Sequence, residues 1–179
     1  IHLFWADERC VSPENEESNY GNCHRVLLSH IPIPKENIHR IRGEEDSVAE
    51  SARYALEIQN HIVSRKGQIT FFDWVFLGVG FDGHTASLFP RQDSLSSSNL
   101  CEAVRHPQTG QRRVTMTPLA IKRSKRITYH VIGQEKARVV FELASGLGEK
   151  KSYPAAHIHG EWYLDLEAAS NLSPEFGSS

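Results

Sequence analysis

The sequence has few cysteines, little net charge and no long apolar run, and each shortage excludes a class of protein. Only three cysteines occur among 179 residues, without CxxC spacing, so neither a disulfide framework nor a cysteine-based metal site is expected. Twenty basic and 22 acidic side chains give a net charge of −2, which favours neither nucleic acid nor an anionic membrane as a partner. No run is long enough to cross a bilayer and no signal-peptide segment opens the chain, so the predicted location is the cytoplasm.

The composition is that of an ordinary globular domain, with 39% hydrophobic and 23% charged residues. We expect one domain over residues 1–172. Residues 173–179 (SPEFGSS) follow the last periodic segment and are interpreted as a cloning-derived tail. Residues 1–6 (IHLFWA) are strand-like with no turn or cap before them, so we expect residues to be missing upstream.

Short apolar runs alternate with amphipathic stretches along the chain, which predicts βα units around a parallel sheet. Strands are predicted in four places: residues 1–6, 74–77, 114–117 and 127–132. The run 74–77 (WVFL) is apolar without alternation, which predicts a strand in the middle of the sheet with helices on both faces.

Helical spacing predicts three helices. The first contains Tyr20 and ends before Ile31. The second begins at a capping box of Ser47 and Glu50, and its apolar positions are Val48, Ala52, Ala55, Leu56, Ile62 and Val63. The third follows Gly133. Residues 90–111, which include a serine cluster, are predicted to form a loop.

A glycine-rich segment directly follows the strand predicted at residues 74–77, and chemistry gathers at such strand ends. Gly78, Gly80 and Gly83 match GxGxxG, a pattern whose backbone N–H groups can face an anion. A dinucleotide site should continue into a long helix, whereas Pro90 follows soon after Gly83. The pattern therefore argues against a nicotinamide or flavin cofactor.

His84 follows this turn beside Asp82, where a neutral imidazole can accept a proton from water. The residues alone leave two interpretations open. His84 is a catalytic base, or it is one of ten histidines that falls beside a turn by chance.

A second group of histidines, His157 and His159 with nearby Glu161, raises a metal hypothesis. The alternation instead predicts a strand or extended edge with both imidazoles on one face, and no third ligand is spaced for tetrahedral zinc. No metal site is predicted.

Residues 82–90 (DGHTASLFP) resemble the signature of the 6-phosphogluconolactonases. Residues 4–11 (FWADERCV), followed by Ser18-Asn19-Tyr20, resemble the family's other signature. Three shorter motifs follow in the family's order: RVTMT at 113–117, GQEKA at 133–137 and WYLD at 162–165. The chain is identified by these motifs as a member of the family from residue 1 to about residue 172.

The resemblance implies a doubly wound, mostly parallel Rossmann-like α/β sheet with helices on both faces and a site at the carboxyl ends of the strands. It also implies hydrolysis of 6-phospho-D-glucono-1,5-lactone to 6-phosphogluconate, a step of the oxidative pentose phosphate pathway, without metal or other cofactor. The implied partner is this small phosphorylated lactone, with no nucleic acid and no membrane, and the oligomeric state stays open.

The resemblance also implies roles for single residues. His84 matches the family's proposed general base, which activates water and returns the proton to the departing ring oxygen. Arg9, Arg113 and Lys136 match cations that hold the phosphate or a developing oxyanion, and Gly80 belongs to the substrate-binding turn. Asp82 either orients His84 or stabilises the turn through its side chain.

Two departures from the family pattern matter. The family carries a Gly-Gly-Ser type turn upstream of residues 7–9 that helps to hold the phosphate, and no residue of this sequence supplies it. Arg91 stands where relatives often have a small residue, and it either alters the rim of the pocket or only adds surface charge.

Two other functions are weighed. Glucosamine-6-phosphate deaminases share the fold and the Asp-Gly-His turn, but they place a glutamate five positions after the histidine, where this chain has Phe89. Phenylalanine cannot transfer protons, so the deaminase hypothesis loses its acid-base partner. A catalytically silent sugar-phosphate sensor is the other alternative, and an intact signature around His84 argues against it.

Overall fold

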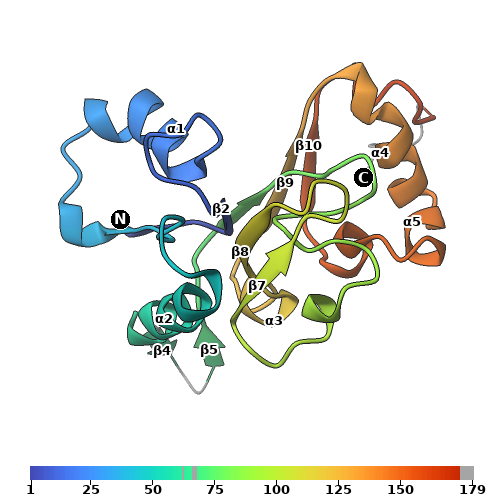
Figure 1. Cartoon of the computed structure of the whole chain (residues 1–179). Helices are drawn as coiled ribbons and strands as arrows, with labels where there is room; N and C mark the ends of the chain where they lie inside the picture. Colours follow the sequence, from blue (N-terminus) through green and yellow to red (C-terminus); the bar gives the residue numbers. More distant parts are fainter. Residues whose placement is uncertain (62, 66–67, 174–179) are drawn as a thin grey trace.

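The computed structural model describes residues 1–61, 63–65 and 68–173 and has a mixed α/β architecture, which confirms the predicted fold class (Figure 1). The strands are β1 (Leu3–Phe4), β2 (Asp7–Arg9), β3 (Ile38–His39), β4 (Val63–Arg65), β5 (Gln68–Thr70), β6 (Val75–Leu77), β7 (Cys101–Arg105), β8 (Arg112–Met116), β9 (Ile127–Val131) and β10 (Glu161–Leu164). The sheet β10-β9-β6 and the pair β1-β3 are parallel, as βα units require, whereas β2-β8-β7 and the pair β4-β5 are antiparallel.

The helices lie around these sheets, with α1 beside the N-terminal segment and α4 and α5 beside β9 and β10 (Figure 1). The α-helices are α1 (Asn19–Val26), α2 (Ser47–Asn60), α3 (Pro118–Ile121), α4 (Ala137–Ala144) and α5 (Leu147–Lys150). Short 3-10 turns span Leu28–His30, Lys35–Asn37, Asp93–Leu95, Gln134–Lys136 and Pro154–His157. The three predicted helices, the one that contains Tyr20, the one that begins near Ser47 and the one that follows Gly133, are thus present as α1, α2 and α4.

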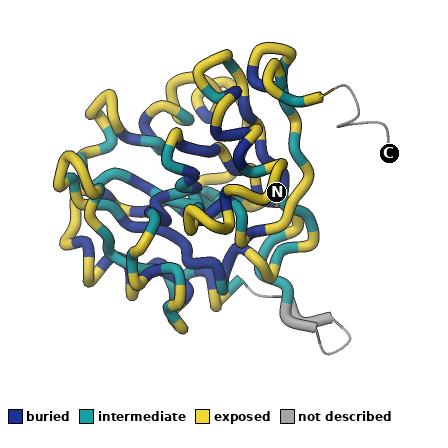
Figure 2. The backbone as a smooth tube through the Cα atoms, turned by 90° about the vertical axis from the view of Figure 1, so that its right-hand side faces the viewer, coloured by how far each residue is buried: buried dark blue, intermediate teal, exposed yellow. Residues whose placement is uncertain are grey.

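The interior is built from apolar side chains of both parallel and antiparallel sheets, and buried segments run through the middle of the molecule (Figure 2). Tyr54 of α2 is fully buried. Its hydroxyl accepts a hydrogen bond from the N–H of Trp5 at 2.8 Å and lies 3.0 Å and 3.2 Å from the carbonyls of Trp5 and His39. One side chain therefore joins α2 to the strands at the start of the chain.

Helix α2 differs from its prediction at its start and in its buried face. The N-cap is Asp46 rather than Ser47, because the Asp46 side chain accepts from the N–H groups of two residues of the first turn. Glu50 accepts instead from the N–H of Arg42 at 2.7 Å, so no capping box forms. The buried face carries Ser47, Glu50, Ser51, Tyr54 and Ile58, while Val48 and Leu56 of the predicted apolar stripe are exposed. Val63 belongs to β4, and Ile62 lies outside the described residues.

The prediction for residues 74–77 is wrong about burial. Val75 and Leu77 are buried but Phe76 is 58% exposed, so β6 alternates like a strand with one open face. Among the described strands, β6 pairs only with β9 and lies at the end of its sheet. Aromatic side chains on the open face hide the alternation in the sequence: Trp74 stacks on Phe76 with ring centroids 4.5 Å apart.

Two further predictions need correction. Residues 90–111 are not one loop, because β7 (Cys101–Arg105) pairs with β8 inside this range. His157 closes a 3-10 turn begun by Pro154, so it is not in the predicted extended edge. The predicted tail lies outside the described residues except for its first residue, Ser173.

A membrane-spanning helix would need length and continuous apolarity. Among the residues that the structure describes, no helix has enough of both to cross a bilayer.

Candidate active site

The glycine-rich segment forms a compact turn at the end of β6. The Gly83 N–H donates to the carbonyl of Gly80 at 2.9 Å, and the Gly80 N–H donates to the carbonyl of His84 at 2.8 Å. Gly83 has a φ of +75°, which glycine adopts without strain. No helix lies between Gly83 and Pro90, all of which the structure describes, so the helix that a dinucleotide fingerprint requires is absent from this segment.

The turn holds an imidazole against a carboxylate. Nδ1 of His84 lies 2.6 Å from Oδ1 of Asp82, and the same oxygen accepts the backbone N–H of His84 at 3.2 Å. Because an ionised carboxylate only accepts, Nδ1 carries the proton and Nε2 keeps its lone pair. The His84 side chain is 26% exposed, so water can reach it.

Asp82 stays ionised in this pair. Burial raises the pKa of the carboxyl, but the hydrogen bond from His84 and the electrostatic interaction with it lower the pKa, and the net pKa lies below its usual value. Asp82 therefore contacts both the imidazole and the turn backbone, which are the two predicted alternatives for its role.

Gly80 makes room for this pair. A Cβ at Gly80 would lie 2.1 Å from Nδ1 of His84, so any side chain would displace the ring. Its N–H is already engaged within the turn, so it does not face outward to an anion as the motif suggested. A Cβ at Gly78, by contrast, would meet nothing within 4 Å.

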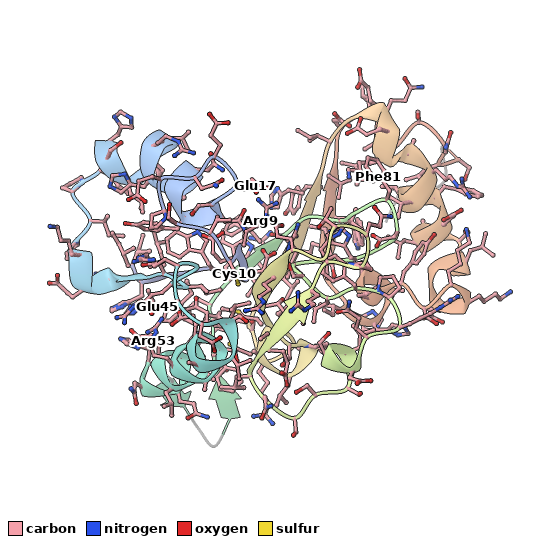
Figure 3. All side chains as sticks on the ribbon, viewed as in Figure 1. Arg9, Cys10, Glu17, Glu45, Arg53 and Phe81 are labelled. Carbon is pink, nitrogen blue, oxygen red and sulfur yellow. The ribbon has the colours of Figure 1, made fainter. Side chains whose placement is uncertain are left out.

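Two of the predicted cations are cross-strand neighbours. Arg9 of β2 faces Arg113 of β8 in the antiparallel register. Burial and then the charge of Arg9 lower the pKa of Arg113, as expected where two guanidinium groups lie close without a full counter-charge. Nη1 of Arg9 donates to the carbonyl of Glu17 at 2.5 Å, beside it in Figure 3. Nε of Arg9 is buried, and no described residue accepts from it. This pair of cations has unused capacity for an anion.

The two acidic residues of the Asp-Glu-Arg strand end, Asp7 and Glu8, form hydrogen bonds with different segments. Asp7 accepts from the hydroxyl of fully buried Ser87 at 2.6 Å, which ties the segment after His84 to β2. Buried Glu8 accepts the N–H groups of Asn19 and Tyr20, each at 2.7 Å, at the start of α1. These two acids anchor β2, which ends at Arg9, to the segment after His84 and to the start of α1.

Lys136 reaches the glycine turn from the opposite side. Its Nζ lies 3.8 Å from the centroid of the Phe81 ring, and Phe81 lies across from Arg9 on the α4 side of the molecule (Figure 3). Lys136 directly precedes α4, which confirms its predicted position near a helix N-terminus. The structure thus brings Lys136 to the turn and Arg113 to Ser87, with Nη1 3.4 Å from the Ser87 hydroxyl.

One nearby residue was missed in the sequence. The His106 ring packs edge-on against Phe89 with ring centroids 5.0 Å apart, and the centroid of the Phe89 ring also lies 5.0 Å from that of His84. Burial and then the charge of Arg113 lower the pKa of His106, which favours a neutral imidazole. No sequence signal marks it, because it follows β7 within the segment predicted to be a loop.

Arg91 lies just beyond the signature. It is exposed and has a φ of +63°, a conformation that residues with a side chain rarely adopt. Glycine adopts this conformation without strain, so the arginine side chain has a backbone cost at this position.

The chain is similar to known proteins over most of its length. The family model for glucosamine-6-phosphate isomerases/6-phosphogluconolactonase matches residues 1–164. The 6-phosphogluconolactonase of Aggregatibacter actinomycetemcomitans is 45% identical over 96% of this chain and 74% of its own length. The crystal structure of devB protein has a TM-score of 0.90 at 45% identity, covering 96% of this chain and 74% of that one.

A more distant solved structure has the same fold. The 6-phosphogluconolactonase of Thermotoga maritima has a TM-score of 0.78 at 28% identity, covering 92% of this chain and 72% of that one. Motifs, turn geometry and whole-chain similarity coincide, and the chain belongs to the glucosamine-6-phosphate isomerase/6-phosphogluconolactonase family.

Proposed function

We propose that this chain is a 6-phosphogluconolactonase, which hydrolyses 6-phospho-D-glucono-1,5-lactone to 6-phosphogluconate in the oxidative pentose phosphate pathway. The observation that carries the proposal is the hydrogen bond between Nδ1 of His84 and Asp82 at 2.6 Å. It leaves Nε2 of a partly exposed imidazole as a proton acceptor, and the Phe89 ring that packs on this imidazole lies 5.8 Å from Arg113. The names of the similar proteins support the same reaction.

The proposed mechanism needs no covalent intermediate. Nε2 of His84 removes a proton from water as the oxygen attacks the lactone carbonyl, and Asp82 stabilises the imidazolium that forms. The imidazolium then protonates the ring oxygen as the C–O bond breaks. The proton taken from water is returned to the ring oxygen, and the electron pair of the broken C–O bond stays on that oxygen. His84 is therefore a neutral base again at the end of the cycle.

The cations supply binding and charge stabilisation. Arg9 has a buried Nε that no described residue pairs, and Arg113 donates to Gln111 at 3.2 Å and to Ser87 at 3.4 Å but forms no ion pair with a described residue. A phosphate or oxyanion would complete both guanidinium groups. Lys136 adds a third charge beside the turn. Gly80 serves the site by giving His84 room.

The deaminase alternative is disfavoured by Phe89. This fully buried ring occupies the position of the second acid-base residue, 5.0 Å from the His84 ring. It cannot exchange a proton. The sensor alternative is disfavoured by the aligned His84–Asp82 pair, which a binding-only domain does not require.

The proposal includes a cytoplasmic location and no partner beyond the small substrate. Three free cysteines fit a reducing compartment, and the net charge of −2 gives no attraction to nucleic acid or anionic lipid. We further propose one catalytic domain over residues 1–172.

A three-substrate assay tests the function. The purified chain is offered the phosphorylated lactone, the same lactone without phosphate, and glucosamine 6-phosphate. We expect hydrolysis of the phosphorylated lactone above its spontaneous rate, weak hydrolysis of the unphosphorylated lactone, and no ammonia from the amino sugar. Ammonia release without lactone hydrolysis would favour the deaminase, and tight binding of sugar phosphates without turnover would favour the sensor.

A further inference from the structure

Three histidines far apart in the sequence meet at the start of the chain. His2 precedes β1, His39 ends β3, and His61 follows the last residue of α2. One ring nitrogen of each lies within 4.8 Å of one from each of the others. The closest approach is 2.8 Å, between Nδ1 of His2 and Nε2 of His39. None of the three belongs to the candidate active site.

The protons on two of these rings are fixed by one residue. Nδ1 of His39 donates to the Glu57 carboxylate at 2.6 Å, and Nδ1 of His61 donates to the main-chain carbonyl of Glu57 at 2.8 Å. Both acceptors lack a proton to give, so Nε2 of His39 and Nε2 of His61 carry lone pairs. Histidines that bind a metal usually donate their other N–H to a carboxylate or a carbonyl in this way.

We propose that His2, His39 and His61 form a three-imidazole binding site for a divalent transition-metal ion of the zinc class, with Glu57 as its outer support. Imidazole nitrogen is the ligand type that zinc and its neighbours prefer over calcium or magnesium. His39 is buried and His2 is exposed, so the site has a fixed floor and an open side where water completes a tetrahedron.

The surroundings keep the rings in place. Phe4 stacks on His39 with centroids 4.3 Å apart and meets the edge of His61 at 5.7 Å. His39 and His61 lie 4.1 Å apart, centroid to centroid. Phe4 covers one side of the rings and the Glu57 carboxylate binds Nδ1 of His39, so the remaining ring nitrogens are available to a metal ion.

Loading the site requires small movements of the rings, because the ligand nitrogens lie between 2.8 Å and 4.8 Å apart. Zinc–nitrogen bonds of about 2.0–2.1 Å in a tetrahedron place ligand nitrogens ~3.4 Å apart, wider than the His2–His39 hydrogen bond. Because His2 is exposed, its ring can move outward and shift its proton to the other nitrogen through solvent. No oxidation and no net proton release are needed.

A bound ion would join β1, β3 and the end of α2, so its effect is on stability rather than on lactone hydrolysis. The test uses the full chain without an added histidine tag, stripped with a chelator and titrated with zinc. Calorimetry gives stoichiometry and affinity, and cobalt gives the absorption spectrum of a tetrahedral nitrogen site. We expect one zinc per chain and a rise in Tm of roughly 5–10 °C at a hundredfold excess over Kd.

Variants locate the ion. His2→Ala and His61→Ala should each weaken zinc at least tenfold, and Glu57→Gln about 10–100-fold through the outer support. His159→Ala is the matched control, because it removes an exposed histidine elsewhere and should leave affinity unchanged. Each shift is measured from the variant's own metal-free Tm, so a change in basal stability does not blur the result. Absence of a zinc-induced shift, or binding that survives both substitutions together, would overturn the proposal.

Discussion

His84 and His39 are built alike and surrounded differently. In each, Nδ1 lies 2.6 Å from a carboxylate oxygen, of Asp82 in one and Glu57 in the other. Each pair therefore fixes the tautomer and leaves Nε2 with a lone pair. The pair alone cannot tell a general base from a metal ligand.

The neighbours of each pair make the difference. Arg113 lies 5.8 Å from the Phe89 ring that packs on His84, so the first region favours an anion and repels a metal cation. Beside His39 the nearest ring nitrogen is that of His2, at 2.8 Å, and one ring nitrogen of each of the three imidazoles lies within 4.8 Å of the others. The charge around a histidine–carboxylate pair, rather than the pair itself, determines which chemistry we assign to it.

The largest expected effect separates the two regions by replacing one base. His84→Asn keeps a hydrogen-bonding side chain of similar size but cannot take up a proton near neutrality, so kcat should fall roughly 10²–10⁴-fold. Steady-state hydrolysis, corrected for the spontaneous reaction, measures the loss. Zinc affinity at the His2–His39–His61 site should stay the same. Near wild-type kcat in this variant would show that His84 is not the base.

A smaller effect is expected from one methyl group. Gly80→Ala places a Cβ 2.1 Å from Nδ1 of His84 and 2.9 Å from Oδ1 of Asp82, so the pair must separate and kcat should fall by roughly tenfold or more. Gly78→Ala is the matched control, since its Cβ meets nothing within 4 Å. Equal kcat values for the two variants would contradict the steric role of Gly80. Circular dichroism before the assay distinguishes loss of fold from loss of alignment.

The sequence predicted the active-site region better than the histidine cluster for a physical reason. Asp82 and His84 are two positions apart, so a local motif carries their geometry. His2, His39 and His61 are brought together only when β1, β3 and α2 pack, and no spacing rule reaches that far. His106 was missed for the same reason.

The fold class could be predicted from the sequence, but not the buried face of every helix and strand. The alternation of apolar runs and helices identified the α/β class. Helix α3 (Pro118–Ile121) was too short to be predicted, and strand β7 was too polar. In α2 the apolar residues pointed to one face, yet Tyr54 and Glu50 occupy the buried one because each finds hydrogen-bond partners there. A hydrophobic pattern does not predict the burial of polar side chains that are hydrogen-bonded in the fold.

The smallest expected effect sharpens the comparison by removing a charge and keeping its shape. Asp82→Asn retains an oxygen that can accept from Nδ1 and the backbone N–H of His84, but it no longer stabilises the imidazolium. Because the Asp82 side chain is 44% exposed, water screens part of this charge, and kcat should fall only several-fold.

The same substitution should move the acidic limb of the kcat/KM profile. The lowered pKa of Asp82 keeps it ionised through the mildly acidic range, so Asp82 itself does not titrate across this limb in the wild-type chain. The Asp82 carboxylate stabilises positive charge beside it, so removing its charge should shift the limb to lower pH. Profiles of the two proteins, measured with correction for spontaneous hydrolysis, give the shift. A limb at unchanged pH with reduced kcat would confine Asp82 to holding the turn, through its bond to the His84 N–H.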